Sequence, residues 1–260
     1  MTHEFDGKKY AKASAHQNEW GTRLIAELHL RGNERILDLG CGDGALTSRL
    51  ALLVPEGEVL GIDASRGMIG AASPKAGSNL RFRRLDINEL DFEDEFDVVF
   101  SNATLHWVKD HRRLLRNVRR ALRPGGRLRF NFAGEGNCSR LCSAINEAMS
   151  RDEYRQLFED FEWPWYMPGP DDYRLLAESS RFGMVRVWGE NADRFFPDQA
   201  AMIGWIDQPG LVPFLANLSA EAKRSFRNFV VSRMIEETKR ENGTCFETFR
   251  RINVSASVGR

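Results

Sequence analysis

The sequence has 260 residues, and its 37 basic and 37 acidic side chains give a formal net charge of zero at neutral pH. This balance argues against a nucleic-acid partner, because domains that bind polyanions usually carry a basic excess, and 42% hydrophobic residues argue against a disordered chain. The length suits one large domain, no apolar run is as long as a bilayer span, and the N-terminal segment does not resemble a signal peptide, so we expect a soluble cytoplasmic protein without a membrane partner.

Strand-like and helix-like segments alternate between residues 34 and 133. Strands are predicted at ERILDLG, EVLGID, LRFRRLD, FDVVFSN and RLRFNF, and helices at GALTSRLALLV, SRGMIGAAS and DHRRLLRNVRRAL. Ser65 and Asp110 precede two of these helices as capping residues. The alternation predicts an α/β fold with a doubly wound, mostly parallel, Rossmann-like sheet. Ligands of such sheets bind at the carboxyl ends of the strands.

The second half of the chain, residues 134–260, has a different pattern. Helical stretches are predicted near 138–160 and 219–241, with the strand MVRVWGE between them and a last strand at CFETFRRINVSASV. We expect a helical cover and two more strands of the same sheet, which makes seven strands in a single domain, as a monomer or weak homodimer. Within residues 1–260 the expected parts are an N-terminal cap helix (1–30), a cofactor-binding core (31–133), a helical cover with one strand (134–245) and the last strand (246–260).

The turn after the first strand is rich in glycine and reads Asp38-Leu39-Gly40-Cys41-Gly42-Asp43-Gly44-Ala45. Glycines allow a sharp turn and a close approach of a ligand to the backbone, and the following helix offers free N–H groups at its N-terminus. These features predict a nucleotide-type site. The same letters satisfy the G-x-G-x-x-A pattern of dinucleotide-binding enzymes, so the turn alone does not separate a nicotinamide enzyme from a methyl-donor enzyme.

Acidic residues end the next two predicted strands. Asp63 closes the second strand, where a carboxylate can accept hydrogen bonds from both hydroxyls of a ribose. Asp86 closes the third strand and is followed by Ile87. A carboxylate can accept from the exocyclic amine of adenine while an adjacent apolar side chain covers the ring. The pair of strand ends therefore predicts an adenosine site.

The motifs DLGCGDG, GIDAS, LDIN, FDVVFSNATLHWV and LRPGG stand in the order and spacing of the class I S-adenosylmethionine-dependent methyltransferases, which the chain resembles over residues 34–133. Within that family it looks most like the small-molecule carboxyl methyltransferases of the trans-aconitate and juvenile-hormone-acid type. The segment from Tyr10 to Gln17 resembles their cap helix, and the tail leading to FETFRRI resembles the trans-aconitate enzymes. The resemblance implies methyl transfer from S-adenosylmethionine to a carboxylate oxygen of a small organic acid, without a metal.

The resemblance also implies roles for single residues on the donor side. Gly40, Gly42 and Gly44 would form the loop under the methionine part of the donor, and Asp38 would lie near its amino group. Tyr10 would close over the donor. The residues expected to contact the donor are Asp38, Gly40, Cys41, Gly42, Asp63, Ala64, Met68, Asp86, Ile87, Asn102 and Tyr10.

On the acceptor side the resemblance implies His106, Trp107 and Gln17. His106 and Gln17 would hydrogen-bond one carboxylate oxygen and leave the other free to attack. A carboxylate is ionised at neutral pH, so alignment and proximity would supply the catalysis without a general base. With an amine or phenol acceptor, His106 would be the first candidate for the base. An anionic acceptor also needs a cation, for which Arg140, Arg174 and Arg194 are candidates.

Several alternatives stay open at this point. The acceptor can be an amine, a carrier-bound malonyl group or a lipid-like acid. The glycine pattern is also consistent with a nicotinamide-dependent oxidoreductase. A third possibility, besides a methyltransferase and an oxidoreductase, is a protein that binds the donor without turnover. Aromatic side chains of the second half either line the acceptor pocket or anchor the cover to the sheet, and they are Trp163, Trp165, Tyr166 and Trp205, with Met167 beside them.

Overall fold

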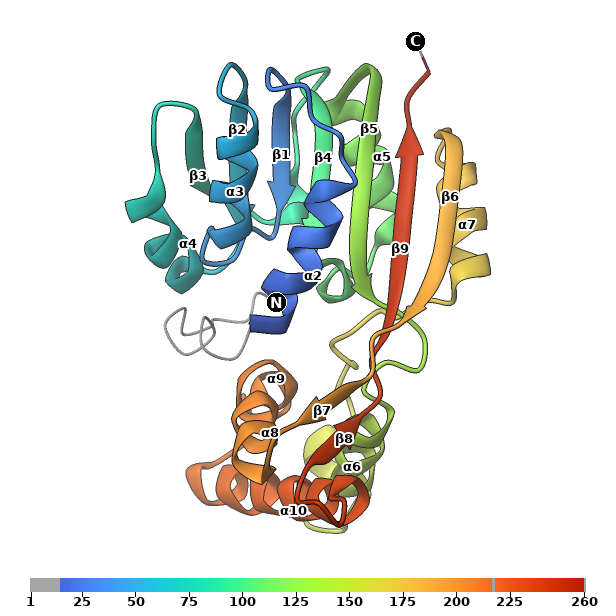
Figure 1. Ribbon diagram of the computed structural model, residues 1–260. Helices are drawn as coiled ribbons and strands as arrows, with labels where there is room; N and C mark the ends of the chain where they lie inside the picture. Colours follow the sequence, from blue (N-terminus) through green and yellow to red (C-terminus); the bar gives the residue numbers. More distant parts are fainter. Residues whose placement is uncertain (1–14, 217, 260) are drawn as a thin grey trace. The chain divides into compact units, whose positions relative to one another are not determined.

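The computed structural model describes residues 15–216 and 218–259, with side chains described from residue 19 onward except 208 and 209 (Figure 1). Its main feature is a seven-stranded sheet in the order β3-β2-β1-β4-β5-β9-β6. Strands β1 to β5 run parallel, and β9 pairs antiparallel with β5. The predicted α/β fold, with a mostly parallel doubly wound sheet, is confirmed. The strands are β1 (Arg35–Leu39), β2 (Glu58–Asp63), β3 (Leu80–Arg84), β4 (Phe96–Asn102), β5 (Leu122–Ala133), β6 (Gly183–Asn191) and β9 (Arg250–Ser257).

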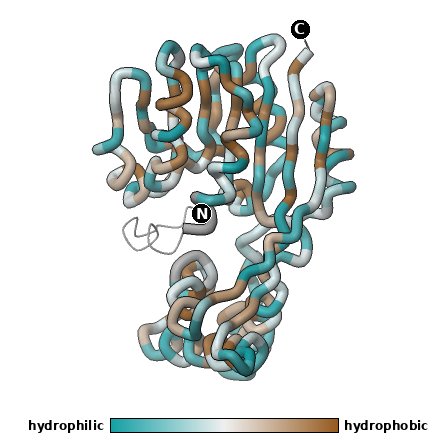
Figure 2. Tube along the Cα trace, viewed as in Figure 1, coloured by the Kyte–Doolittle hydropathy of each residue, from teal (hydrophilic) through white to brown (hydrophobic). Residues whose placement is uncertain are grey.

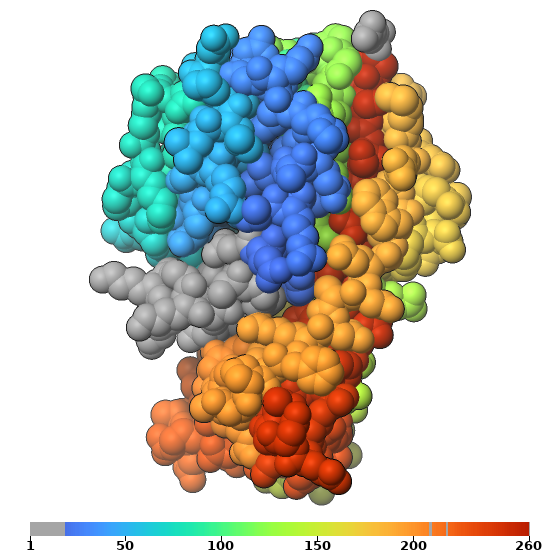
Figure 3. Space-filling model, viewed as in Figure 1, coloured from blue at the N-terminus to red at the C-terminus, as the bar shows by residue number. Residues whose placement is uncertain are grey.

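Helices cover both faces of this sheet. The apolar sides of α2 and α3 pack on one face against Ile36, Val98 and Phe100, while α5 and α7 pack on the other. Figure 3 shows α2 and α3 in blue over the first face, and Figure 2 shows the hydrophobic run of the central strands that they cover. These helices are α2 (Ala15–Ala26), α3 (Ala45–Leu53), α4 (Arg66–Ala72), α5 (His111–Ala121) and α7 (Pro170–Ser179), with short 3-10 turns η1 (Ser73–Lys75), η2 (Ile87–Glu89) and η3 (Leu105–Trp107).

The chain divides into two compact units. The first contains the sheet and is built from residues up to 135, Trp165–Glu190 and the residues from Arg251 onward. The second is built from Gly136–Pro164 and Asn191–Arg250. It holds α6 (Ser139–Ser150), η4 (Arg155–Phe158), α8 (Gln199–Trp205), the π-helical η5 (Ile206–Gly210), α9 (Val212–Leu215), α10 (Ala220–Thr238) and the antiparallel pair β7 (Arg194–Phe196) and β8 (Cys245–Glu247).

Three elements differ from the sequence prediction. The helix predicted near 138–160 ends at Ser150, because Arg151 adopts an extended backbone. The fifth strand begins at Leu122, five residues before the predicted segment RLRFNF, which starts at Arg127. The last strand is two strands, since β8 pairs with β7 in a small sheet whereas β9 pairs with β5 in the main one. The expected grouping of all residues into one domain stays a prediction.

None of the helices within the described ranges combines the length and the apolar character that crossing a bilayer requires.

Candidate functional site

The turn between β1 and α3 has left-handed backbone at its glycines. Gly40 has φ +72° and Gly42 has φ +55°, a region that residues with a Cβ rarely adopt. A Cβ added at Gly40 would lie 2.1 Å from the Thr104 Cγ2 atom, whereas one added at Gly42 would meet nothing within 4 Å. Gly40 therefore lets the loop after β4 pack closely, and Gly42 leaves open space above its backbone, as a ligand cradle requires.

Asp63, at the end of β2, is tied to this turn. Its Oδ2 atom accepts a hydrogen bond from the Gly42 N–H at 3.0 Å, and its Oδ1 atom accepts from the Ser65 N–H at 2.8 Å. A carboxylate oxygen has more than one acceptor position, so both oxygens can accept further bonds from hydroxyl groups. The adjacent α4 is capped by Ser65, whose hydroxyl accepts from the N–H of the buried Met68 at 3.3 Å. Ala64 follows Asp63 directly, and its carbonyl accepts from the Arg84 Nε at 3.1 Å.

The end of β3 lies beside the end of β2, because the Leu85 N–H donates to the Asp63 carbonyl at 3.1 Å. Asp86 follows, and its Oδ1 atom accepts from the Asn88 N–H at 2.9 Å, which caps the short η2. Ile87 is buried in the core cluster that also contains Ile62. The two acidic residues predicted at neighbouring strand ends are thus brought to the same edge of the sheet as the glycine turn.

Asp38 of β1 is 2% exposed, and its Oδ2 atom accepts from the Thr47 hydroxyl at 2.7 Å. Burial raises the pKa of this carboxyl from 3.8 to about 7; the charge of Asp63 adds to the rise, and the Thr47 bond opposes it. Burial also raises the pKa of the Cys41 thiol, so this cysteine stays protonated. The site therefore contains a carboxyl whose protonation changes near neutral pH.

Three hydrogen bonds hold the loop after β4 against the glycine turn and β5. The Ser101 hydroxyl donates to the Leu39 carbonyl at 2.8 Å, and the Thr104 hydroxyl donates to the Gly40 carbonyl at 3.1 Å. The Ala103 N–H donates to the Asn131 carbonyl at 2.7 Å. Asn102, which is buried, lies between these anchors. The anchors bring the following η3, with His106 and Trp107, to the edge where Gly42 and Asp63 lie.

The His106 ring is partly exposed, but its Nδ1 atom is enclosed and has no hydrogen-bond partner in the part of the chain that the structure describes. Burial lowers the pKa of His106 to about 3, and the positive charge of Arg251 and an electrostatic interaction with His111 add to the effect. The imidazole is therefore neutral at physiological pH, with one ring nitrogen as donor and the other as acceptor. The Trp107 ring lies 5.4 Å from the His106 ring and 5.8 Å from the Trp165 ring, measured between centroids.

Arg251, which was not among the predicted cations, contributes to the lowered pKa of His106. It is buried at the start of β9, and its Nε atom donates to the Asn131 Oδ1 at 2.8 Å. Its guanidinium lies over the Trp20 ring of α2 at 5.0 Å. In the sequence Arg251 stands at a polar position of the alternating last strand, in phase with Asn253 and Ser255, so no local pattern marks it as buried.

The arginines selected from the sequence have other surroundings. Arg174 is exposed and pairs with Asp171 at 2.9 Å. Arg140 pairs with Glu247 at 3.8 Å, and Arg194 lies over the Phe196 ring at 4.7 Å, both inside the second unit.

The predicted aromatic residues divide between the two units. Trp165 and Tyr166 belong to the first unit, where the Tyr166 N–H donates to the His106 carbonyl at 2.8 Å. Trp163 contacts Phe214 and Trp205 contacts Phe249 within the second unit. The backbone of Gln17 lies in α2, but its side chain is outside the described part, and Tyr10 lies outside the described residues altogether.

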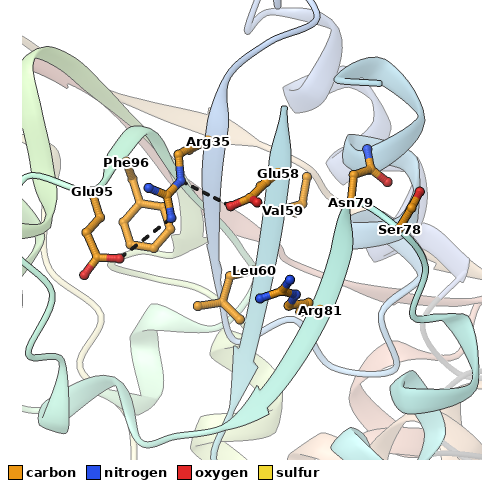
Figure 4. Close-up of a pocket in the computed structure, with 9 residues that line it drawn as sticks. All are labelled: Arg35, Glu58, Val59, Leu60, Ser78, Asn79, Arg81, Glu95 and Phe96. Atoms are coloured by element: carbon orange, nitrogen blue, oxygen red, sulfur yellow. Dashed lines mark ion pairs between the residues drawn. The ribbon is translucent and has the colours of Figure 1, made fainter. Parts of the chain in front are cut away.

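A separate hollow of about 210 Å³ lies at the amino ends of β1, β2 and β3 (Figure 4). Arg35 extends between Glu58 and Glu95 there, with N···O distances of 3.4 and 3.9 Å. The hollow is at the opposite ends of the strands from Gly42 and Asp63, and the charges of Arg35 and Arg81 offset those of Glu58 and Glu95. It is therefore distinct from the candidate site.

Comparisons with known proteins agree on one enzyme class. Residues 37–130 match the family model of a methyltransferase domain. The trans-aconitate 2-methyltransferase of Deinococcus radiodurans is 46% identical over 205 residues, which cover 77% of this chain and 79% of that enzyme. The enzyme of the same name from Methylobacterium nodulans is 29% identical over 239 residues, covering 86% of each chain. Phosphoethanolamine N-methyltransferase 2 of Haemonchus contortus, solved with phosphomonomethylethanolamine and S-adenosylhomocysteine, has the same fold, with a TM-score of 0.59, 19% identity and coverage of 93% of this chain and 53% of that one.

Proposed function

We propose, since the chain belongs to the class I S-adenosylmethionine-dependent methyltransferases of the trans-aconitate type, that it transfers the donor's methyl group to a carboxylate oxygen of a small polycarboxylic acid. The observation that carries the proposal is the enclosed, neutral His106 imidazole, whose Nδ1 lacks a partner within the described residues, at the edge that also holds Gly42 and Asp63. A trans-aconitate-like acid is the proposed acceptor. Cytoplasmic location and a monomer or weak homodimer stay predictions.

The residues at the carboxyl edge fit the donor. The open space above Gly42 would take its methionine part, the Asp63 carboxylate would accept from its ribose hydroxyls, and Asp86 would accept from its adenine amine. Asp38 would neutralise the amino group. When bound, S-adenosylmethionine supplies a methyl group that its sulfonium already activates. The protein's task on this side is to hold the donor in one orientation, which is worth about 7–11 kcal/mol at best.

His106 suits an acceptor that needs no base. A group with a pKa of about 3 does not take up a proton at neutral pH, so it is a poor general base for an amine or phenol. A carboxylate arrives ionised, and a neutral imidazole can still donate one hydrogen bond to it. Arg251, whose charge contributes to the lowered pKa of His106, would also favour an anionic acceptor at this place. These features support carboxyl methylation over the other acceptor chemistries.

Replacing His106 tests the acceptor side. We expect His106→Leu to lower kcat with trans-aconitate about tenfold, because one hydrogen bond to a charged group is lost, while the Kd of S-adenosylhomocysteine changes less than twofold. His106→Asn should retain part of the rate, since its amide N–H can take the place of Nδ1. Steady-state kinetics and calorimetry measure both quantities. Equal kcat in all three proteins would remove His106 from the acceptor site.

Asp38 predicts a pH dependence of donor binding. Its pKa of about 7 means that the carboxyl is largely protonated at pH 6, so binding of a cationic amino group should release a proton. We expect the affinity for S-adenosylhomocysteine to rise about tenfold from pH 6 to 8. The pKa of Asp38 in the folded protein lies above the unfolded value of 3.8, so Asp38 stabilises the fold at low pH, and this stability is lost as the pH rises through 7. Asp38 should therefore lower the melting temperature of the ligand-free protein over the pH range in which it raises the affinity for the donor. Calorimetry in buffers of different ionisation enthalpy measures the proton release. We expect Asp38→Asn to abolish it. Proton release that persists in Asp38→Asn would refute the placement of Asp38 near the amino group of the donor.

The direct test of the function is a screen of small acids with a radiolabelled methyl donor. A base-labile ester from trans-aconitate or a similar polycarboxylate supports the proposal. A base-stable product would indicate an amine or carbon acceptor. Binding of S-adenosylhomocysteine without any product would indicate a binding protein, and thermal stabilisation by NAD(H) but not by S-adenosylhomocysteine would indicate an oxidoreductase.

A further inference from the structure

Two of the expected acceptor residues lie on a very short element. His106 and Trp107 belong to η3, a single 3-10 turn whose first residue is preceded by Thr104 without a side-chain cap. Short 3-10 turns have poor hydrogen-bond geometry and do not hold a conformation by themselves. The orientation of the His106 ring must therefore depend on contacts from other parts of the first unit.

One such contact comes from His111, a buried residue at the start of α5. Its Nε2 atom is 2.9 Å from the Leu105 carbonyl, and its Nδ1 atom is 2.9 Å from the Tyr173 hydroxyl. A carbonyl only accepts, so the Nε2 atom carries the proton and donates. The Nδ1 atom then accepts, and the Tyr173 hydroxyl is its donor. The result is a directed chain from Tyr173 of α7 through His111 to the backbone of η3.

The next carbonyl of η3 is also held by a hydrogen bond. The Tyr166 N–H donates to the His106 carbonyl at 2.8 Å, and the Tyr166 ring lies 4.6 Å from the His111 ring. The His111 ring also contacts Phe132 and Tyr173, at 5.4 and 5.3 Å. Two successive carbonyls of the acceptor loop are thus fixed by residues of the Trp165–Glu190 segment, one directly and one through His111.

His111 and Tyr173 are polar side chains at a place in the hydrophobic core that two apolar side chains could also fill. Tyr173 belongs to the hydrophobic core cluster with Phe132 and Ala177 and is fully buried. Burial lowers the pKa of His111 to about 4 and raises the pKa of Tyr173, so both groups are neutral and act as fixed hydrogen-bonding partners. Fully satisfied buried networks specify one geometry, which is what a loop carrying a reacting-centre contact needs.

We propose that His111 and Tyr173 are positioning residues that orient the His106 loop toward the acceptor. The inference rests on the proposed function, because it gives the orientation of His106 a purpose. It assigns no contact with substrate to His111 or Tyr173. The pair acts through the Leu105 carbonyl, and its loss should change acceptor turnover while leaving the donor site on β1 and β2 intact.

The test compares two substitutions of His111. His111→Gln keeps an N–H close to the Nε2 position, whereas His111→Leu fills a similar volume without a donor. We expect His111→Leu to lower kcat with the acceptor about tenfold without changing the Kd of S-adenosylhomocysteine, and His111→Gln to recover most of the rate. Equal kcat in His111→Gln and His111→Leu at equal melting temperature would overturn the proposal.

Tyr173→Phe keeps the ring packing and is the variant expected to fold in any case. We expect it to lower kcat about threefold and to move the imidazole NMR signals of His106 relative to the unsubstituted protein. The matched control is Tyr154→Phe, which removes a buried tyrosine hydroxyl within the second unit and should change neither quantity. An unmoved His106 signal in Tyr173→Phe would contradict the positioning role.

The tautomer of His111 gives a readout that needs no turnover. We expect nitrogen NMR shifts of an imidazole protonated at Nε2 in the unsubstituted protein, and protonation at Nδ1 would overturn the proposal. If no acid yields an ester, the proposed function fails, while the tautomer and the His106 signals still decide this inference. If esters form normally in all the variants, the inference alone fails.

Discussion

Asp63→Ala is expected to weaken the binding of S-adenosylhomocysteine by about a hundredfold. The substitution removes the carboxylate and with it the charge-assisted hydrogen bonds to the ribose, each worth about 1.5–3 kcal/mol. The substitution also removes the hydrogen bonds that the carboxylate accepts from the Gly42 and Ser65 N–H groups and that hold the glycine turn in place. Isothermal titration calorimetry measures the effect directly.

The matched control for this experiment is Asp198→Ala. Asp198 caps α8 in the second unit by accepting from the Ala201 N–H at 2.7 Å, so the control also removes a carboxylate that binds backbone N–H groups. We expect it to leave the affinity within twofold of the unsubstituted protein. An affinity of Asp63→Ala within twofold of the unsubstituted protein would exclude Asp63 from the donor site.

Gly42→Ala is expected to reduce donor affinity by about a hundredfold or more while the protein still folds. The added Cβ would meet no protein atom within 4 Å. The free energy of unfolding should therefore fall only by the amount that a left-handed residue with a Cβ costs, about 1–2 kcal/mol. The same methyl group would occupy the space in which we place the methionine part of the donor. Calorimetry with S-adenosylhomocysteine, combined with the melting temperature, separates the two effects.

Gly243→Ala controls for the backbone strain. Gly243 has φ +83° and open space around an added Cβ, and it belongs to the second unit. Both substitutions should lower the melting temperature to a similar extent, and only Gly42→Ala should lose affinity. If both variants bind the donor alike, the space above Gly42 is not the donor site. Gly40→Ala is a useful contrast, because its Cβ would clash with Thr104 and is expected to disturb the fold itself.

Local sequence patterns were sufficient to predict the elements whose structure depends on residues close along the chain. The buried run of β1 and the periodic apolar side of α5 were predictable, because burial on both faces or on one face imposes its period on the sequence. The caps Ser65 and Asp110 were predictable for the same reason, since each side chain bonds a backbone N–H only three residues away.

The candidate donor site was predictable in its residue types. Asp63 is the last residue of β2 and Asp86 lies two residues beyond β3, and parallel strands bring their carboxyl ends to one edge. The acceptor side was predictable only through resemblance, because His106 and Trp107 follow a strand without any local pattern that demands them.

Sequence by itself thus determined the order of the elements, the glycine turn and the acidic strand ends, because these are set by interactions between residues close along the chain. The tertiary structure decided the split of the last predicted strand into β8 and β9, the placement of Arg251 beside His106, and the chain from Tyr173 through His111 to Leu105. Each of these joins residues distant in sequence. His111 and Tyr173, for example, are 62 positions apart, and a single sequence carries no periodic signal for a pairing at that separation.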